Sequence, residues 1–434
     1  MSTRWMARAL LLDDPCEARL NYHLLGPETP DSHPAVPTRN GNVTSSIISL
    51  LATTMGGGLL ALPYAFAKCG LLVGVGFLLL SALATGYSLV ILVACSNVSG
   101  EASFEGNVRF YLGRKWLIVL RGALYALLLL TASAVFVVVM DLGPKVLGMM
   151  FYPSPLLHPL MVGSYAMALM FYFSAQDSLH ALRYTSFAVL CCIAYFLYAI
   201  VYTFGCDPHV QESVVAINSP SSWFEGVPIM FTAYQCQYNI FKINEEMRED
   251  QKDKINKVIW LGILGVVTAV YSVAGLLGYF MLGAGVSGDI LTEFSRSDLF
   301  SMARGLLALT SLLKLPLLLI PLRISLEETC GLDPRAVDWR GRSAFCLIIN
   351  LVSFFVACAL GSLSKVLDFA GCTAGVVIAF LLPGLLRVRY LQTRNCSSDS
   401  RQIPGQVLAW ALIVGGILAG TASLASIVFD WDGA

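Results

Sequence analysis

Residues 53–58 read Thr-Thr-Met-Gly-Gly-Gly, and they stand in the middle of an apolar stretch that runs over 43–67. Each glycine weakens a helix by roughly 1 kcal/mol relative to alanine, so three in a row predict a break in this stretch. A second disrupted stretch, 224–241, is unusually short and carries Pro228 near its start. Two interrupted segments in matching positions predict a fold built from two related halves.

The composition indicates the environment in which these stretches fold. Hydrophobic residues make up 56% of the chain and charged residues only 13%, whereas a soluble chain usually carries about 25% charged residues. Such a chain cannot cover its surface with polar groups, and it is too apolar to be disordered. A net charge of zero gives no general attraction to nucleic acid. The sequence therefore predicts an integral membrane protein.

Eleven apolar stretches approach the length of about 20 residues that crosses a bilayer. They are 43–67, 71–95, 117–140, 159–175, 184–205, 224–241, 258–282, 303–322, 343–363, 368–386 and 406–429. With a cytoplasmic N-terminus, 22 of the 28 basic residues fall on the inner side, which is the side that basic residues prefer. Residues 1–42 then form a disordered cytoplasmic tail, 43–429 the membrane domain and 430–434 a short non-cytoplasmic end.

Polar residues within the disrupted stretches mark a candidate binding site. Thr232, Gln235 and Asn239 are spaced to share one face of a helix. Where two inverted halves of five helices carry matching breaks, the broken helices meet near the middle of the membrane and their free N–H groups hold anionic substrate groups. Glycine-rich stretches also form close-packing seams between helices. The matching disruption five stretches later favours a binding site over a seam.

Four motifs, in order, resemble those of the amino acid/auxin permease family. Residues 55–66, Met-Gly-Gly-Gly-Leu-Leu-Ala-Leu-Pro-Tyr-Ala-Phe, resemble its GxGxLxLPxAF signature, and residues 228–247 resemble its sixth helix. Residues 316–323 resemble its eighth-helix PxxxxPxR, and Gly371 with Pro383 fits its tenth helix. The chain is most similar to the branch of sodium-coupled neutral amino acid transporters.

This resemblance implies an all-α amino acid transporter with eleven transmembrane helices and the leucine-transporter fold, in which a 5+5 inverted repeat has broken helices 1 and 6 and one extra helix follows. It implies secondary active transport by alternating access. We expect the substrate carboxylate to bind the backbone N–H groups of Gly56, Gly57 and Gly58. The side chains expected around the substrate are those of Thr53, Thr54, Thr232, Tyr234 and Gln235.

Departures from that branch concern the coupling ion. That branch has Asn at the position of Ala52 and Thr at the position of Lys314, and both positions are associated with sodium coordination in the branch. The branch also has a His in its sixth helix at the position of Gln237. Alanine offers no oxygen to a cation, and an ammonium group fills the space that a cation needs. We therefore predict sodium-independent transport, coupled to a proton or to exchange. Lys314 takes the place of sodium, with Thr310 and Ser311 on the same helix face.

A membrane sensor and a membrane enzyme are two other classes of function for a chain of this kind. The alternative is a membrane amino acid sensor that signals through the cytoplasmic tail and loops, including the mixed-charge segment 242–257. An enzyme is not expected, because no stretch presents a His–carboxylate pair or a Ser/His/Asp set. No metal or cofactor is expected either. The predicted partners are the amino acid, a coupling proton and the lipid bilayer, in a plasma, lysosomal or vacuolar membrane.

Overall fold

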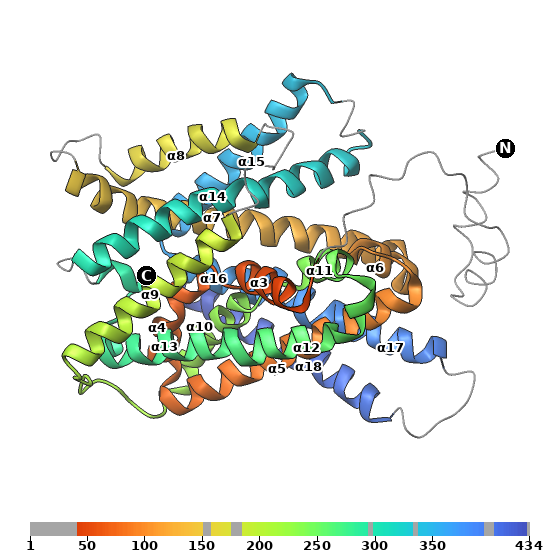
Figure 1. The fold of residues 1–434 in the computed structure, drawn as a ribbon, viewed down its shortest axis with the longest axis horizontal. Helices are drawn as coiled ribbons and strands as arrows, with labels where there is room; N and C mark the ends of the chain where they lie inside the picture. The colour runs from red at the N-terminus through yellow and green to blue at the C-terminus, as the bar shows by residue number, and fades with distance from the viewer. Residues whose placement is uncertain are drawn as a thin grey trace.

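The computed structural model describes residues 41–150, 158–174, 185–293, 298–332, 337–394 and 403–431 (Figure 1). Its α-helices are α3 (Val43–Thr54), α4 (Gly58–Cys69), α5 (Leu71–Ser99), α6 (Phe104–Leu112), α7 (Arg114–Met150), α8 (Pro159–Ser174), α9 (Thr185–Cys206), α10 (Pro220–Ala233), α11 (Ile240–Glu246), α12 (Ile255–Trp260), α13 (Thr268–Leu282), α14 (Asp298–Thr329), α15 (Trp339–Leu360), α16 (Leu363–Ala370), α17 (Leu382–Arg394) and α18 (Ile403–Trp431). Short π-helices, η5 (Leu261–Val267), η8 (Gly371–Gly375) and η9 (Val377–Leu381), join α12 to α13 and α16 to α17. Residues 1–40 and 432–434 lie outside the described ranges, so the predicted tail and C-terminal end stay predictions.

Seven helical segments among the described residues are long and apolar enough to cross a membrane. They are α5, α7, α9, α12 through α13, α15, α16 through α17, and α18. An eighth span is formed if the bent pair α3 and α4 is counted as one, and shorter apolar helices run over Pro159–Tyr172 and Leu299–Leu312. The prediction of a multi-pass, all-helical membrane protein is confirmed. The count of eleven spans stays a prediction.

The first break separates α3 from α4. Asn42 caps α3 by accepting a hydrogen bond from the Ser45 N–H at 2.8 Å, and α3 ends where the backbone of Met55 becomes extended. The chain restarts as α4 at Gly58, and the two helices meet at a bend of 62°. The break that the three glycines predict is therefore present.

The second break lies within the predicted disrupted stretch 224–241. α10 begins at Pro220, continues through Pro228 and ends at Ala233, after which the chain resumes as a short 3₁₀ turn and α11. α10 can end there because its last carbonyl accepts a hydrogen bond from Tyr271 of α13. The helix thus begins before the predicted stretch, and its break follows Ala233.

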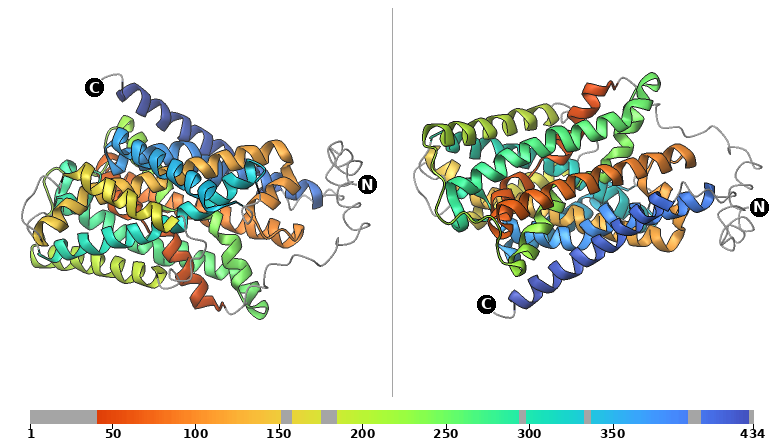
Figure 2. Two further views of the ribbon diagram at one scale, coloured as in Figure 1. Left: turned by 90° about the horizontal axis from the view of Figure 1, so that it is seen from above. Right: turned by 90° about the horizontal axis from the view of Figure 1, so that it is seen from below.

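The half-helices α4 and α10 lie at the centre of the bundle. α4 packs mainly against α10 and α13, and α16 packs against α10. Figure 1 shows α4, α10 and α16 in the middle, with α7, α8, α14 and α15 together on one side, whereas Figure 2 shows α3 at the edge of the bundle. The last helix, α18, runs along the outside of the bundle in both views of Figure 2. Helices without a break therefore pack around α4 and α10.

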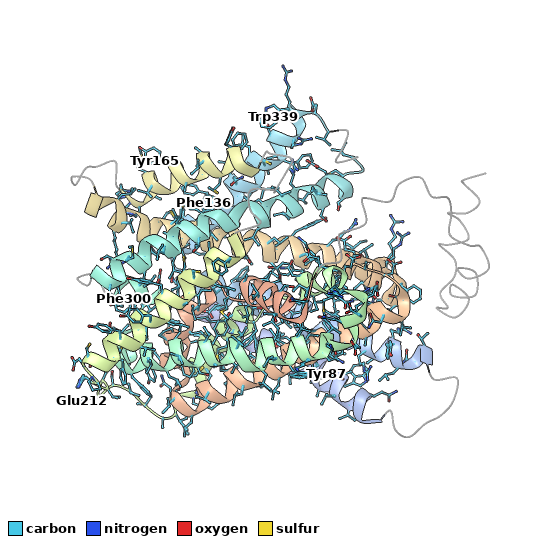
Figure 3. The ribbon with its side chains drawn as sticks, in the orientation of Figure 1. Tyr87, Phe136, Tyr165, Glu212, Phe300 and Trp339 are labelled. Atoms are coloured by element: carbon cyan, nitrogen blue, oxygen red, sulfur yellow. The ribbon has the colours of Figure 1, made fainter. Side chains whose placement is uncertain are left out.

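Large apolar side chains cover the outside of this bundle. Phe355 and Phe187 are 74% and 68% exposed, and Figure 3 shows Tyr165 and Trp339 on its outer surface. Phe136 and Phe300, in contrast, are fully buried. An apolar exterior of this extent is typical of a protein surrounded by lipid.

Candidate functional site

Three consecutive backbone N–H groups are free at the first break. Among the described residues, the N–H groups of Gly56, Gly57 and Gly58 donate to no protein acceptor. Gly56 is exposed, and a Cβ atom placed on it would meet nothing within 4 Å. These groups stand at the N-terminus of α4, where the helix dipole favours a negative charge. The geometry is therefore suited to an anion such as a carboxylate.

The glycines at the break differ in what surrounds them. A Cβ atom on Gly58 would lie 2.8 Å from both the Cα and the Cβ of Ala233, at the end of α10. A Cβ atom on Gly57 would make an ordinary contact of 3.7 Å with Leu363. Gly58 is thus required for the close approach of the two breaks, whereas Gly56 opens onto free space. The sequence leaves close packing and substrate binding open as alternatives for these glycines. In the structure Gly58 serves close packing, whereas Gly56 is accessible to a ligand.

The hydroxyl of Tyr271 joins the carbonyl ends of both broken helices. Its oxygen lies 2.7 Å from the carbonyl oxygen of Ala233 and 3.1 Å from that of Thr54, and the side chain is fully buried. Ala233 and Thr54 end α10 and α3, where helix carbonyls lose their intrahelical partners. The phenol shares its one proton between these two carbonyls. Sequence reasoning missed Tyr271, whose weak signal is a hydroxyl three residues after Thr268 on one helix face.

The two threonines before the first break face inward, and their hydroxyl groups donate hydrogen bonds within their own helix. The hydroxyls of Thr53 and Thr54 donate to the carbonyl of Leu50 at 2.9 and 2.7 Å. Thr54 is buried and Thr53 is half-buried. Each hydroxyl therefore offers only its oxygen lone pairs to a neighbouring group.

The polar side chains predicted from helix 6 are mostly hydrogen-bonded to other helices, and one of them keeps an oxygen without a hydrogen-bond donor. Thr232 donates to the Leu367 carbonyl of α16 at 2.8 Å, and the Tyr234 hydroxyl pairs with that of Thr268 at 2.9 Å. The Nε2 of Gln235 donates to the Gly375 carbonyl at 3.0 Å. Its Oε1 is buried and has no hydrogen-bond partner in the described part of the chain. Gln235 is thus the residue of the three with an acceptor still to satisfy.

The residues predicted to act in ion coupling lie on α14. Thr310 is buried and donates to the Leu307 carbonyl at 3.1 Å, and Ser311 is half-buried. The backbone of Lys314 belongs to α14, but its side chain lies outside what the structure describes. Its role in coupling stays a prediction.

An ion pair joins α4 to α10 on the far side of the breaks from α3. The Nζ of Lys68 lies 2.5 Å from the Oε2 of Glu225, and the hydroxyl of Tyr64 donates to the same oxygen at 3.0 Å. Lys68 also lies over the ring of Tyr64, 5.2 Å from its centroid. The two charged side chains are 32% and 26% exposed. Sequence analysis placed Lys68 between spans, whereas it belongs to the last turn of α4.

Comparison with known proteins assigns this architecture to a family. The model of the family described as transmembrane amino acid transporter protein matches residues 39–429. The chain belongs to this family. Vacuolar amino acid transporter 5 of Schizosaccharomyces pombe is 27% identical to the transporter, covering 87% of this chain and 91% of the relative. The Saccharomyces cerevisiae protein of the same name is 26% identical, covering 89% and 98%.

Two further similarities bear on the branch and the fold. Sodium-coupled neutral amino acid symporter 2 of Danio rerio is 24% identical, over 89% of the transporter and 82% of the symporter. The crystal structure of MhsT in complex with L-phenylalanine matches with a TM-score of 0.57 at 14% identity, over 88% of this chain and 97% of that chain. The latter likeness supports the leucine-transporter type of fold predicted from the sequence.

The transport of amino acids follows from the family, and the prediction that the chain is not an enzyme is confirmed by its transporter relatives. The three relatives above are named as transporters or symporters. The alternative of an amino acid sensor gains no support from them.

Proposed function

We propose that this transporter moves amino acids by alternating access, with the substrate bound where the two broken helices meet. The observation that carries the proposal is the set of N–H groups at residues 56–58, which have no acceptor in the described chain, together with the open space at Gly56. A carboxylate matches three such donors, and charge-assisted hydrogen bonds are stronger than neutral ones. In this proposal eleven spans form two inverted halves of five, with α18 as the extra helix.

The ammonium end of the amino acid is assigned to the second break. Gln235 follows Ala233 by two residues, and Ala233 packs against Gly58. We therefore assign the unpaired Oε1 of Gln235 to the ammonium group of the substrate. A buried amide oxygen gains a hydrogen bond when an ammonium group arrives, which favours an α-amino acid over a simple carboxylic acid.

The proposed function is tested by a screen of amino acid uptake into proteoliposomes that contain the purified full chain. A pH gradient and a sodium gradient are imposed separately for each amino acid. We expect accumulation of at least one amino acid under the pH gradient, or exchange against internal amino acid. Tight binding of an amino acid without movement under any condition would contradict transport and favour the sensor.

Transport is expected to be independent of sodium. Ala52, one turn before the break, is buried and has no side-chain oxygen, and in this proposal the ammonium group of Lys314 takes the place of sodium. Replacing external sodium by choline at constant pH should leave initial uptake rates unchanged within error. A collapse of uptake in choline would show that sodium binds despite these substitutions.

The N-terminus is proposed to be cytoplasmic and the C-terminus to lie on the opposite side. An odd number of spans and the 22 basic residues on the inner side support this orientation. Membrane-impermeant labelling of single cysteines placed at residues 3 and 433 in sealed vesicles should modify one of the two positions in each orientation. Labelling of both from the same side would contradict eleven spans. Because both yeast relatives are named vacuolar amino acid transporters, we propose a vacuolar or lysosomal membrane for this chain.

A further inference from the structure

A buried carboxyl group lies beside the second break. Asp368 of α16 is 6% exposed, and its Oδ1 has no hydrogen-bond partner among the residues that the structure describes. Removing a carboxylate from water without supplying donors is costly, so such a group takes up a proton more readily than one in water. Ionisable groups of this kind inside a membrane protein mark ion or proton pathways.

The backbone around Asp368 is fastened to α10. The carbonyl of the preceding residue, Leu367, accepts the hydrogen bond from Thr232, one residue before the end of α10. At Gly371, one turn later, a Cβ atom would clash with the carbonyl of Pro228, so the two helices are in direct backbone contact. α16 also packs against α4. The helix that carries Asp368 is therefore packed against both α4 and α10.

The charged groups that act on Asp368 are the members of the Lys68–Glu225 ion pair. Lys68 belongs to α4 and Glu225 to α10, and both interact electrostatically with the Asp368 carboxyl. The thiols of Cys69 in α4 and Cys372 in η8 also lie near it. No charged group from the described residues of α7, α15 or α18 acts on it. The Lys68 ammonium thus pairs with Glu225 and also attracts the Asp368 carboxyl, which Glu225 repels.

We propose that Asp368 is the binding site of the coupling proton, which deepens the proposed function and rests on it. In the ionised state the carboxylates of Asp368 and Glu225 share the Lys68 ammonium. When the Asp368 carboxylate takes up a proton from the solvent that reaches the partly exposed Lys68–Glu225 pair, it becomes a neutral carboxylic acid. Lys68 then pairs with Glu225 alone, and this pairing holds α4 to α10. Proton binding is thereby linked to the contact between the two half-helices at the substrate.

A second buried carboxyl provides a matched control. Asp289 lies in the loop between α13 and α14, where its Oδ1 accepts from the Leu291 N–H at 3.0 Å. Burial raises the pKa of Asp289 from 3.8 to about 7. Asp289 precedes a short turn outside the spans, and the charged groups that act on it are Asp141, Lys145 and Arg304. Loss of its charge is not expected to uncouple protons from substrate.

The test uses the purified full chain in proteoliposomes that contain a trapped pH indicator, with net substrate uptake measured in parallel. In Asp368→Asn, the protons moved per substrate taken up should fall by at least about tenfold, whereas Asp368→Glu and Asp289→Asn should resemble wild type. Glu225→Gln should lower the pH of half-maximal uptake and Lys68→Met should raise it, each by about one unit, because they remove opposite charges beside one carboxyl.

The outcomes separate this proposal from the proposed function. Undiminished proton movement in Asp368→Asn overturns the assignment, as does loss of proton movement in Asp289→Asn alone. If Asp368→Asn does not fold, shifts of Glu225→Gln and Lys68→Met in the same direction, or no shifts, overturn it equally. Wild-type protein that accumulates substrate without moving protons also contradicts the proton site while transport stands. Wild-type protein that neither exchanges nor accumulates any amino acid contradicts the proposed function itself.

Discussion

Gly56→Val is expected to abolish substrate binding while leaving the fold intact. The new side chain extends into space that is open in the structure, and the backbone of Gly56 does not lie in the left-handed region. It would stand in front of the three N–H groups and exclude a carboxylate from them. Hydrogen bonds to a charged group contribute about 1.5–3 kcal/mol each, so losing two should weaken binding by about 100-fold or more. Scintillation-proximity binding of the transported amino acid to purified protein measures this.

Two further glycine variants show whether the effect is specific to the site. Gly76→Val makes the same change on α5, also into open space, and should bind substrate like wild type. Gly58→Ala forces a Cβ atom against Ala233 and should instead reduce the yield of monodisperse protein. Normal binding by Gly56→Val would mean that the carboxylate lies elsewhere. The glycines at the break would then serve packing alone.

Tyr271→Phe is expected to weaken both folding and substrate binding. It removes the proton that the carbonyls of Thr54 and Ala233 share, and both carbonyls lie in a buried region. A buried acceptor left without a partner costs about 1–3 kcal/mol, so the variant should unfold at a lower temperature than wild type. Because the carbonyls end the two half-helices that frame the ligand, substrate affinity should fall by about tenfold, which corresponds to 1.4 kcal/mol.

Tyr279→Phe is the matched control on the same helix. Tyr279 is fully buried like Tyr271, and its hydroxyl accepts a hydrogen bond from the backbone N–H of Val215, in a connecting segment away from the breaks. Its loss should lower thermal stability without changing substrate affinity. Equal affinity in the two variants would show that the Tyr271 bridge supports the fold but does not position the substrate. Thermal unfolding of detergent-solubilised protein and equilibrium binding provide the two measurements.

Local sequence patterns placed the first break at its glycines, whereas for the second they indicated the stretch 224–241 but not the residue at which α10 ends. Three consecutive glycines weaken a helix wherever they occur, so the interruption at Gly56–Gly58 follows from residue type alone. Pro228 carries a similar local signal, yet α10 continues through it and ends at Ala233. The end of α10 depends on a hydroxyl from Tyr271, 38 residues further along the chain. A helix terminus that is stabilised from another helix has no local signature.

Contacts with other helices likewise give each of the predicted site residues a different role. Gly56, Gly57 and Gly58 are equivalent in sequence, but only Gly58 lies against Ala233. Thr232 and Tyr234 share the polar stripe with Gln235, and contacts with Leu367 and Thr268 occupy their hydroxyls. The spare acceptor of Gln235 becomes apparent once its amide is seen to donate to Gly375. Which polar atom remains free is a property of its neighbours, not of the residue.

Composition, residue type and short motifs were enough to predict a protein embedded in a membrane, a first helix broken at three glycines and a resemblance to amino acid transporters. Helix packing was needed to show that Tyr271 bridges residues 217 and 38 positions away, and that Lys68 and Glu225 act electrostatically on Asp368. Hydrogen bonds and charges act through space over a few ångströms, so partners distant in sequence are fixed only when the helices pack.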